Sequence, residues 1–242
     1  MATASARRHV QQEMYFHGGK RRGAGRKPRG DRAGTSHAKR PEVERKHPLH
    51  ITLRVVPAVG SLRRRDMYRA VREATIVAAM RERMRIVHVS IQATHLHLLV
   101  EADSKLALSR GMQGFQTSVA RNVNTVLGGD AGRRRGRVFA DRYHCVVIRS
   151  PTQARNALSY VINNWRKHRE DRHERKAIWL ADPFSSGVSF PDWHERRNEM
   201  YMLPIPADHE PLVVYRPRSW LLDKGWSIVG PVSARAIPSQ RP

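Results

Sequence analysis

The chain has 242 residues, and its 45 lysines and arginines against 21 aspartates and glutamates give a formal net charge of +24. A hydrophobic share of 40% suffices for a core, whereas the single cysteine excludes a disulfide framework and a four-cysteine zinc site. The lack of a long apolar run, and of a signal-peptide core in residues 1–13, predicts a cytoplasmic protein without a membrane partner.

The positive charge lies in residues 1–46, with a net charge of +9, and in residues 47–170, with +14, whereas residues 171–242 carry only +1. A nucleic-acid backbone is the simplest match for this charge, and solubility alone is the alternative. Residues 1–46 are rich in glycine and poor in apolar side chains, which predicts a disordered basic arm. Its Arg26, Lys27 and Arg29 resemble a minor-groove hook, so we expect contacts to phosphates or in an A·T-rich groove.

Residues 47–170 alternate between strand and helix patterns and form the predicted folded domain. Period-two alternation and helical spacing predict, in chain order, a strand over 50–56, a helix over 62–84, strands over 86–92 and 95–101, a helix over 104–128, a strand over 143–149 and a helix over 151–169. This order predicts an α+β, ferredoxin-like fold with a four-stranded antiparallel sheet and two helices on one face.

The alternation also assigns side chains to the two faces of the sheet. The side chains predicted to meet the two helices are Ile51, Leu53, Val55, Val87, Val89, Ile91, Leu96, Leu98 and Val100. Those predicted on the opposite face are His50, Thr52, Arg54, His88, Ser90, Gln92, His95 and His97. We expect this second face to be too polar for a second core and therefore to carry the chemistry.

His95 and His97 lie two residues apart on the third predicted strand, so both imidazoles point the same way and can hold one metal ion. Two histidines on an exposed strand are, as the alternative, ordinary surface residues. We expect His50 to be a polar residue of the same face rather than a support for the metal site.

The last predicted helix carries a second set of polar residues. Leu158, Val161, Ile162 and Trp165 follow helical spacing and define its buried stripe. Tyr160 and Asn164 are one turn apart on another face. A helix laid over the polar side of the sheet would present both of them to His95 and His97.

Three strings in this order resemble the single-tyrosine HUH transposases, in particular the REP-associated tyrosine transposases. They are residues 94–100 (THLHLLV), residues 136–144 (GRVFADRYH) and residues 157–164 (ALSYVINN). The resemblance implies that His95, His97 and Asn164 hold a divalent metal, Mg²⁺ or Mn²⁺, and that Tyr160 is the nucleophile. Many members of that branch have proline after the Asn, where this chain has Trp165, so the helix can continue to Arg169.

The resemblance further implies cleavage and rejoining of single-stranded or hairpin DNA through a 5′-phosphotyrosine intermediate, in a nucleoid-associated protein. Relatives act as monomers or as homodimers that exchange the tyrosine helix, so a homodimer is one expected assembly. We expect the arginines of the loop after the second helix to contact phosphates. They are Arg133, Arg134, Arg135, Arg137 and Arg142.

Residues 171–242 form a Trp- and Pro-rich C-terminal extension, whose tryptophans we expect to cover apolar surface of the domain, with stacking on bases as the alternative. Two other functions stay open for the chain. One is a nucleic-acid-binding regulator on the same fold that does not cut. The other is a metal-dependent phosphoesterase acting on RNA, although such enzymes usually carry a second His-x-His triplet, which this sequence lacks.

Overall fold

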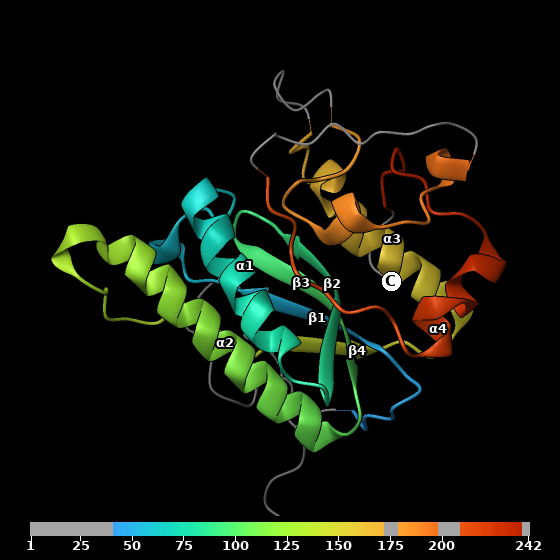
Figure 1. Cartoon of the computed structure of the whole chain (residues 1–242), viewed down its shortest axis with the longest axis horizontal. Coiled ribbons are helices and arrows are strands. Elements are labelled where there is room, and N and C mark those ends of the chain that lie inside the picture. Colours follow the sequence, from blue (N-terminus) through green and yellow to red (C-terminus); the bar gives the residue numbers. More distant parts are fainter. Residues whose placement is uncertain (1–40, 172–178, 198–208, 239–242) are drawn as a thin grey trace, which may run out of the picture. The chain divides into compact units, whose positions relative to one another are not determined.

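The structure, a computed structural model, describes residues 41–171, 179–197 and 209–238. Arg26, Lys27 and Arg29, with the rest of the predicted arm up to residue 40, lie outside the described residues. The elements are β1 (Leu49–Arg54), α1 (Arg65–Ala79), β2 (Met84–Ile91), β3 (His95–Ala102), α2 (Lys105–Gly128), β4 (His144–Val147), α3 (Pro151–Lys167) and α4 (Trp220–Asp223), shown in Figure 1. None of the described helices is both long and apolar enough to cross a bilayer.

The four strands form one sheet in the order β2-β3-β1-β4, and every neighbouring pair is antiparallel. Helices α1 and α2 pack side by side on one face, whereas α3 lies on the other (Figure 1). This arrangement confirms the predicted ferredoxin-like α+β fold, including a tyrosine-bearing helix over the second face.

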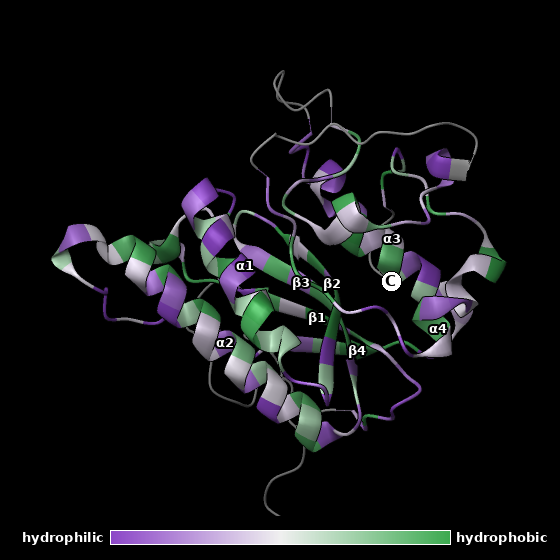
Figure 2. Ribbon diagram, in the orientation of Figure 1, coloured by the Kyte–Doolittle hydropathy of each residue, from purple (hydrophilic) through white to green (hydrophobic). Residues whose placement is uncertain are grey.

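The first core lies between the sheet and the pair α1 and α2. Helix α2 begins where the sequence predicts, because the Ser104 side chain accepts a hydrogen bond from the backbone N–H of Ala107. Figure 2 shows hydrophilic and hydrophobic segments alternating along α2, as expected for a helix with one buried face. Its buried stripe includes Leu108, Met112, Phe115, Val119 and Val123.

Two sequence predictions for this region are wrong. The helix predicted over residues 62–84 spans only Arg65–Ala79: Leu62 donates its backbone N–H to the carbonyl of Ala93, and Met84 already pairs with Ala102 in the sheet. Val87 faces away from α1 and α2, because the register of β2 shifts between Ile86 and His88 and turns its side chain to the opposite face.

The second face of the sheet is more apolar than predicted. Val87 and Leu99 join a separate buried cluster formed by α3 and the C-terminal extension. Trp193 and Trp226 are buried in this cluster, as predicted for tryptophans that cover the domain, whereas Trp220 is 56% exposed. The polar residues therefore occupy only part of this face: His50, His95 and His97 on β1 and β3, and His88 and Ser90 on β2.

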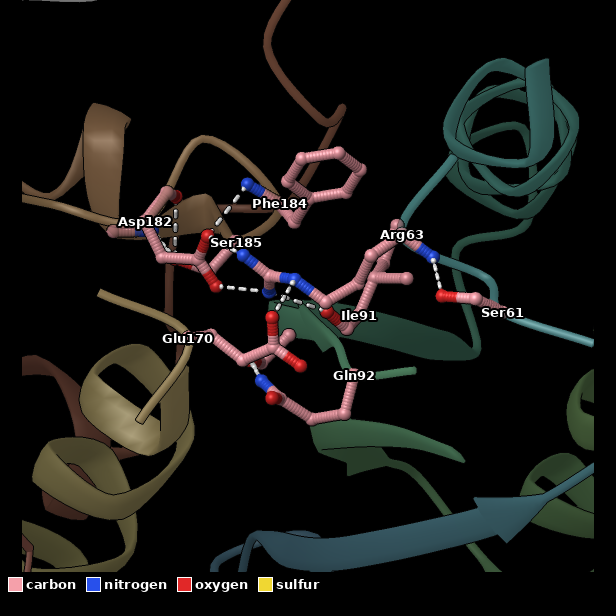
Figure 3. A network of polar contacts seen from close by, with 10 residues as sticks. Ser61, Arg63, Ile91, Gln92, Glu170, Asp182, Phe184 and Ser185 are labelled. Atoms are coloured by element: carbon pink, nitrogen blue, oxygen red, sulfur yellow. Dashed lines mark hydrogen bonds and ion pairs between the residues drawn. The ribbon is translucent and has the colours of Figure 1, made fainter. Parts of the chain in front are cut away.

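Two buried ion pairs attach the C-terminal extension to the sheet. The carboxylate of Glu101 is fully buried and accepts hydrogen bonds from the Arg85 guanidinium and from the backbone N–H groups of Arg218 and Ser219. Beside the end of β2, the guanidinium of Arg63, which precedes α1, donates two hydrogen bonds of 2.8 Å to the Asp182 carboxylate (Figure 3). Such bidentate pairs are strong as well as specific in geometry.

Arg63 also donates a hydrogen bond of 2.9 Å to the Ile91 carbonyl, and its Nε lies 3.5 Å from the Glu170 carboxylate. Burial by itself would lower the pKa of Arg63, but the carboxylates of Asp182 and Glu170 raise it above its ordinary value. We call Arg63, Asp182, Glu170 and the Ile91 carbonyl the Arg63 clamp. It joins the end of β2, the segment after α3 and the C-terminal extension.

Removing the carboxylate from this clamp should destabilise the fold strongly. We expect Asp182→Ala to lower the free energy of unfolding by about 3–5 kcal/mol, because it leaves the Arg63 charge buried without its main partner. Urea denaturation followed by circular dichroism measures the change. The matched control is Asp66→Ala at the exposed Arg64–Asp66 pair, which should cost at most about 1 kcal/mol. Equal losses in both variants would contradict the role of the clamp.

A buried histidine at the contact with the extension makes stability depend on pH. His88 lies within hydrogen-bonding distance of the Ser186 hydroxyl, at 3.1 Å, and burial lowers its pKa from 6.5 to about 4. The unfolded chain therefore binds a proton at His88 at a higher pH than the folded chain does. Stability from this group is fully present above pH 6.5 and is lost as the pH falls towards 4.

We expect this loss to reach the order of 3 kcal/mol. The measurement compares the free energy of unfolding between pH 4 and 7 for the wild-type chain and for His88→Gln, which cannot titrate. The other histidines contribute equally to the pH dependence of the free energy of unfolding in both proteins. Parallel pH profiles for the two proteins would refute the prediction.

Candidate active site

Four imidazoles meet over the polar part of the second face. The ring centroids of His95 and His97, both on β3, are 4.7 Å apart. The ring of His50, on β1, stacks on His97 at 5.2 Å, and the ring of His168, just after α3, lies 5.3 Å from His95. The antiparallel register of β1 and β3, which pairs Thr52 with His97, puts these side chains on one face.

One nitrogen of His97 is held in place and the other is left without a partner. Its Nδ1 lies 3.1 Å from Nε2 of His50 and 3.2 Å from the Thr52 hydroxyl. Its Nε2 is buried and has no hydrogen-bond partner among the described residues. We expected His50 to be merely polar. The contact shows that His50 also packs against His97 and restrains its ring.

Helix α3 brings Tyr160 to this cluster. The Tyr160 ring meets the ring of His97 edge-on, with centroids 5.2 Å apart and planes at 88°, and it meets His50 at 5.6 Å. The ammonium of Lys167 lies 4.8 Å from the centre of the Tyr160 ring. Tyr160 is only 9% exposed, so its ring position is set by packing. The structure thus brings together the tyrosine and the histidine pair, which are far apart in sequence.

Asn164 lies one turn beyond Tyr160 on the same face of α3. It is fully buried, and neither its Oδ1 nor its Nδ2 has a hydrogen-bond partner among the described residues. Because Tyr160 contacts His97 and His168 contacts His95, Asn164 lies on the helix between the two residues that touch the histidine pair. A buried amide without partners is costly, which is typical of a group kept for binding.

Sequence reasoning missed His168. Tyr160, Asn164 and His168 follow one another at intervals of four, so extending this count by one turn would have found it. His168 reaches His95 because α3 runs on to Lys167 instead of stopping after Asn164. Trp165, in place of a proline, allows that continuation.

The imidazoles of this cluster are uncharged at neutral pH. Burial is the largest cause of the lowered pKa of each ring. The pKa of His50 and that of His95 fall to about 4, and the pKa of His97 falls well below 6.5. A neutral imidazole keeps the lone pair that a metal ligand needs. Across the described residues, no group of three or more His, Cys, Asp or Glu side chains is arranged to hold a metal ion.

These residues fit a divalent cation. His97 Nε2 and Asn164 Oδ1 are both buried without partners, and His95 lies beside His97. Nitrogen and oxygen donors of this kind suit Mg²⁺ or Mn²⁺ with open positions for a substrate.

The segment that follows the predicted basic loop, at Phe139 and Ala140, lies next to the end of β1 at Arg54 and Val55. Phe139 pairs with Val55, and Ala140 donates its N–H to the carbonyl of Arg54, the residue paired with His95. Two of the predicted arginines serve the loop itself. Arg134 donates to the side chain of Asn124, and Arg137 donates to the carbonyls of Phe139 and Ala140. The side chains of the others are exposed; they are Arg133, Arg135 and Arg142.

Comparison with known proteins gives one family and a set of solved structures. The family described as IS200-like transposase matches residues 46–164, which span β1 to Asn164, whereas no curated protein matches the chain. A REP-associated tyrosine transposase bound to a REP hairpin aligns at 15% identity with a TM-score of 0.49, covering 76% of this chain and 98% of that chain. A candidate transposase from Deinococcus radiodurans R1 aligns at 12% identity with a TM-score of 0.35, covering 57% and 97%.

The unpartnered amide of Asn164 leads to a prediction for stability. Asn164→Leu should raise the free energy of unfolding of the metal-free chain by about 1–3 kcal/mol, because an apolar side chain of similar size removes two buried unpaired groups. The neighbouring Asn163→Leu is the matched control. Asn163 also has a buried unpartnered Oδ1, but its substitution breaks a hydrogen bond of 2.9 Å to the Ser233 carbonyl and leaves that carbonyl unpaired, so it should not show the stabilisation expected for Asn164→Leu. Urea denaturation in EDTA measures both, and a destabilised Asn164→Leu would contradict the prediction.

Proposed function

We propose that this chain is a DNA-processing enzyme that cleaves and rejoins single-stranded or hairpin DNA with Tyr160 as the nucleophile. The match of its residues 46–164 to the IS200-like transposase family supports this proposal. The observation that carries this proposal is the contact of the Tyr160 ring with His97, the histidine whose Nε2 is buried and unpartnered. A single-stranded or hairpin substrate is favoured because a nucleophile on a packed helix needs an exposed backbone.

In the proposed reaction the phenolic oxygen of Tyr160 attacks a backbone phosphorus atom. A phosphotyrosine ester forms with the 5′ side, the bond from phosphorus to the 3′ oxygen breaks, and the phenolic proton ends on the released 3′-hydroxyl. Attack of a 3′-hydroxyl on the phosphotyrosine reverses these changes and joins the strands. One ester replaces another in each step, so no nucleotide cofactor is consumed. A phenol with an ordinary pKa near ~10 needs activation for this attack.

His95, His97 and Asn164 would hold a divalent cation, Mg²⁺ or Mn²⁺, which when bound supplies neutralisation of charge at the scissile phosphate. His50 and Thr52 keep the His97 ring in the orientation that leaves Nε2 towards the site. Lys167, over the Tyr160 ring, adds a positive charge beside the nucleophile. Positive charge nearby favours the phenolate form of a tyrosine.

The positive charge of the chain would attract the phosphates of the DNA backbone. Arg133, Arg135 and Arg142 are exposed in and after the loop that follows α2, and we propose that they contact phosphates. Arg134 and Arg137 are held by hydrogen bonds within the protein, so they shape the loop. The contacts predicted for Arg26, Lys27 and Arg29 stay predictions.

Covalent trapping tests the nucleophile. Wild-type protein incubated with labelled hairpin DNA and Mn²⁺ should give an adduct that survives denaturing electrophoresis, and Tyr160→Phe should give none, because it lacks the attacking oxygen. Tyr215→Phe is the matched control: its hydroxyl donates to the Ala79 carbonyl, away from the histidines, and its adduct should equal that of the wild type. An adduct with Tyr160→Phe would disprove the assignment, and binding without any adduct would favour the non-cutting regulator.

Calorimetric titration with Mn²⁺ tests the metal site apart from activity. We expect His97→Ala and Asn164→Ala to abolish or strongly weaken binding. His50→Phe, which removes the support of His97, should weaken it by about 10–100-fold. His88→Gln provides a histidine control, since His88 contacts Ser186 and Phe190 rather than the cluster. Unchanged affinity in His97→Ala would show that the histidine pair is not the site.

A further inference from the structure

A pocket of about 370 Å³ lies between the first turns of α1 and the C-terminal extension, and four aromatic side chains line it. They are Tyr68, Trp179, Phe184 and His209. The rings of Tyr68 and Phe184 lie 5.4 Å apart at 80°, and the Tyr68 hydroxyl donates a hydrogen bond of 2.7 Å to the Glu210 carbonyl. These contacts hold the aromatic walls in fixed positions.

Arginines from one side of α1 line the same pocket. Arg65, Arg69 and Arg72 follow helical spacing and share a face. Arg72 pairs with the Glu210 carboxylate at 2.9 Å, which uses up its charge within the protein. Arg69 is exposed, and in the described part of the chain it has no ion pair. Aromatic walls with an available cation suit a flat ring that carries an anion.

The pocket is connected to the candidate active site through the Arg63 clamp. The Phe184 ring, one of its walls, lies 4.5 Å from the Arg63 guanidinium (Figure 3). Arg63 contacts Glu170, two residues after His168, whose ring packs on His95. A series of contacts through Phe184, Arg63 and Glu170 thus links one wall of the pocket to the segment that carries His168.

We propose that this pocket binds one unpaired base of the DNA strand on which the enzyme acts, with the base stacked on the aromatic walls and its phosphate near Arg69. The inference rests on the proposed function, because it needs DNA as the substrate. Every base has a face that stacks on an aromatic ring. The volume lies at the small end of ligand pockets, which favours one nucleotide over a duplex.

The test uses the full chain and fluorescence anisotropy. The probes are fluorescein-labelled DNA hairpins with a short run of thymidines at the 5′ or the 3′ end, in EDTA to prevent cleavage. One thymidine at a time is replaced by an abasic nucleotide. We expect one position to lose about tenfold in affinity, because it loses the stacked base, while the others change little.

Variants then assign that position to the pocket. In Trp179→Ala the intact probe should bind about tenfold more weakly, and the abasic substitution should cost nothing more. Arg69→Gln, at an exposed site where folding is not in question, should weaken all probes alike and reduce the salt slope by about 1. Trp220→Ala, an exposed tryptophan outside the pocket, should keep the wild-type pattern.

The outcomes separate the two proposals. Two outcomes would overturn the pocket proposal alone, provided that the chain binds DNA and forms the Tyr160 adduct. In one, no abasic substitution weakens binding. In the other, the same abasic substitution still weakens binding in Trp179→Ala. Unchanged binding by Arg69→Gln would also overturn it. A wild-type chain that binds none of the probes would overturn the pocket together with the proposed function.

Discussion

One buried guanidinium ties the segment after α3 to the rest of the fold. Arg63 is bound on three sides, by Asp182, Glu170 and the Ile91 carbonyl, and so fixes the end of α3 against the end of β2. The cost of burying this charge is offset only because each partner is in place. On the other side of α3, Asn163 donates to Ser233 and Arg166 to Ala234, so the C-terminal extension covers the helix. All of residues 157–165 are consequently buried. Tyr160 contacts His97 of the same chain.

This enclosure allows the site to hold groups that would otherwise weaken the fold. His97 Nε2 and the Asn164 amide have no partners among the described residues, and each such buried group costs free energy. Two separate apolar clusters, one on each face of the sheet, supply the stability that offsets this cost. The same burial keeps the pKa of His50 and His95 near 4, so their rings stay neutral. The burial of this face of the sheet by α3 and the extension therefore both packs the helix and keeps the imidazoles neutral.

How far the sequence predicts this molecule depends on which interactions decide each feature. Alternation of period two and helical spacing are local, so they predict the sheet, the shared face of His95 and His97, and the shared face of Tyr160 and Asn164. Val87 was misassigned because a bulge, which no local pattern reveals, shifts the register of β2. The support of His97 by His50 depends on the pairing of β1 with β3, which only the fold defines. The loop carbonyls that bind Arg137 likewise come together only on folding.

Trp165 allows helix α3 to continue to residues that contact both the histidine pair and the C-terminal extension. A proline there would remove a backbone N–H and favour a break in the helix. With Trp165 the helix continues, and Arg166, whose guanidinium lies 4.8 Å over the Trp165 ring, donates to the carbonyls of Leu180 and Ala234 on two parts of the extension. The added turn also carries His168 to His95 and ends beside Glu170 of the Arg63 clamp. The last turn of α3 and the residues just after it therefore contact the histidine pair through His168, the extension through Arg166 and the Arg63 clamp through Glu170.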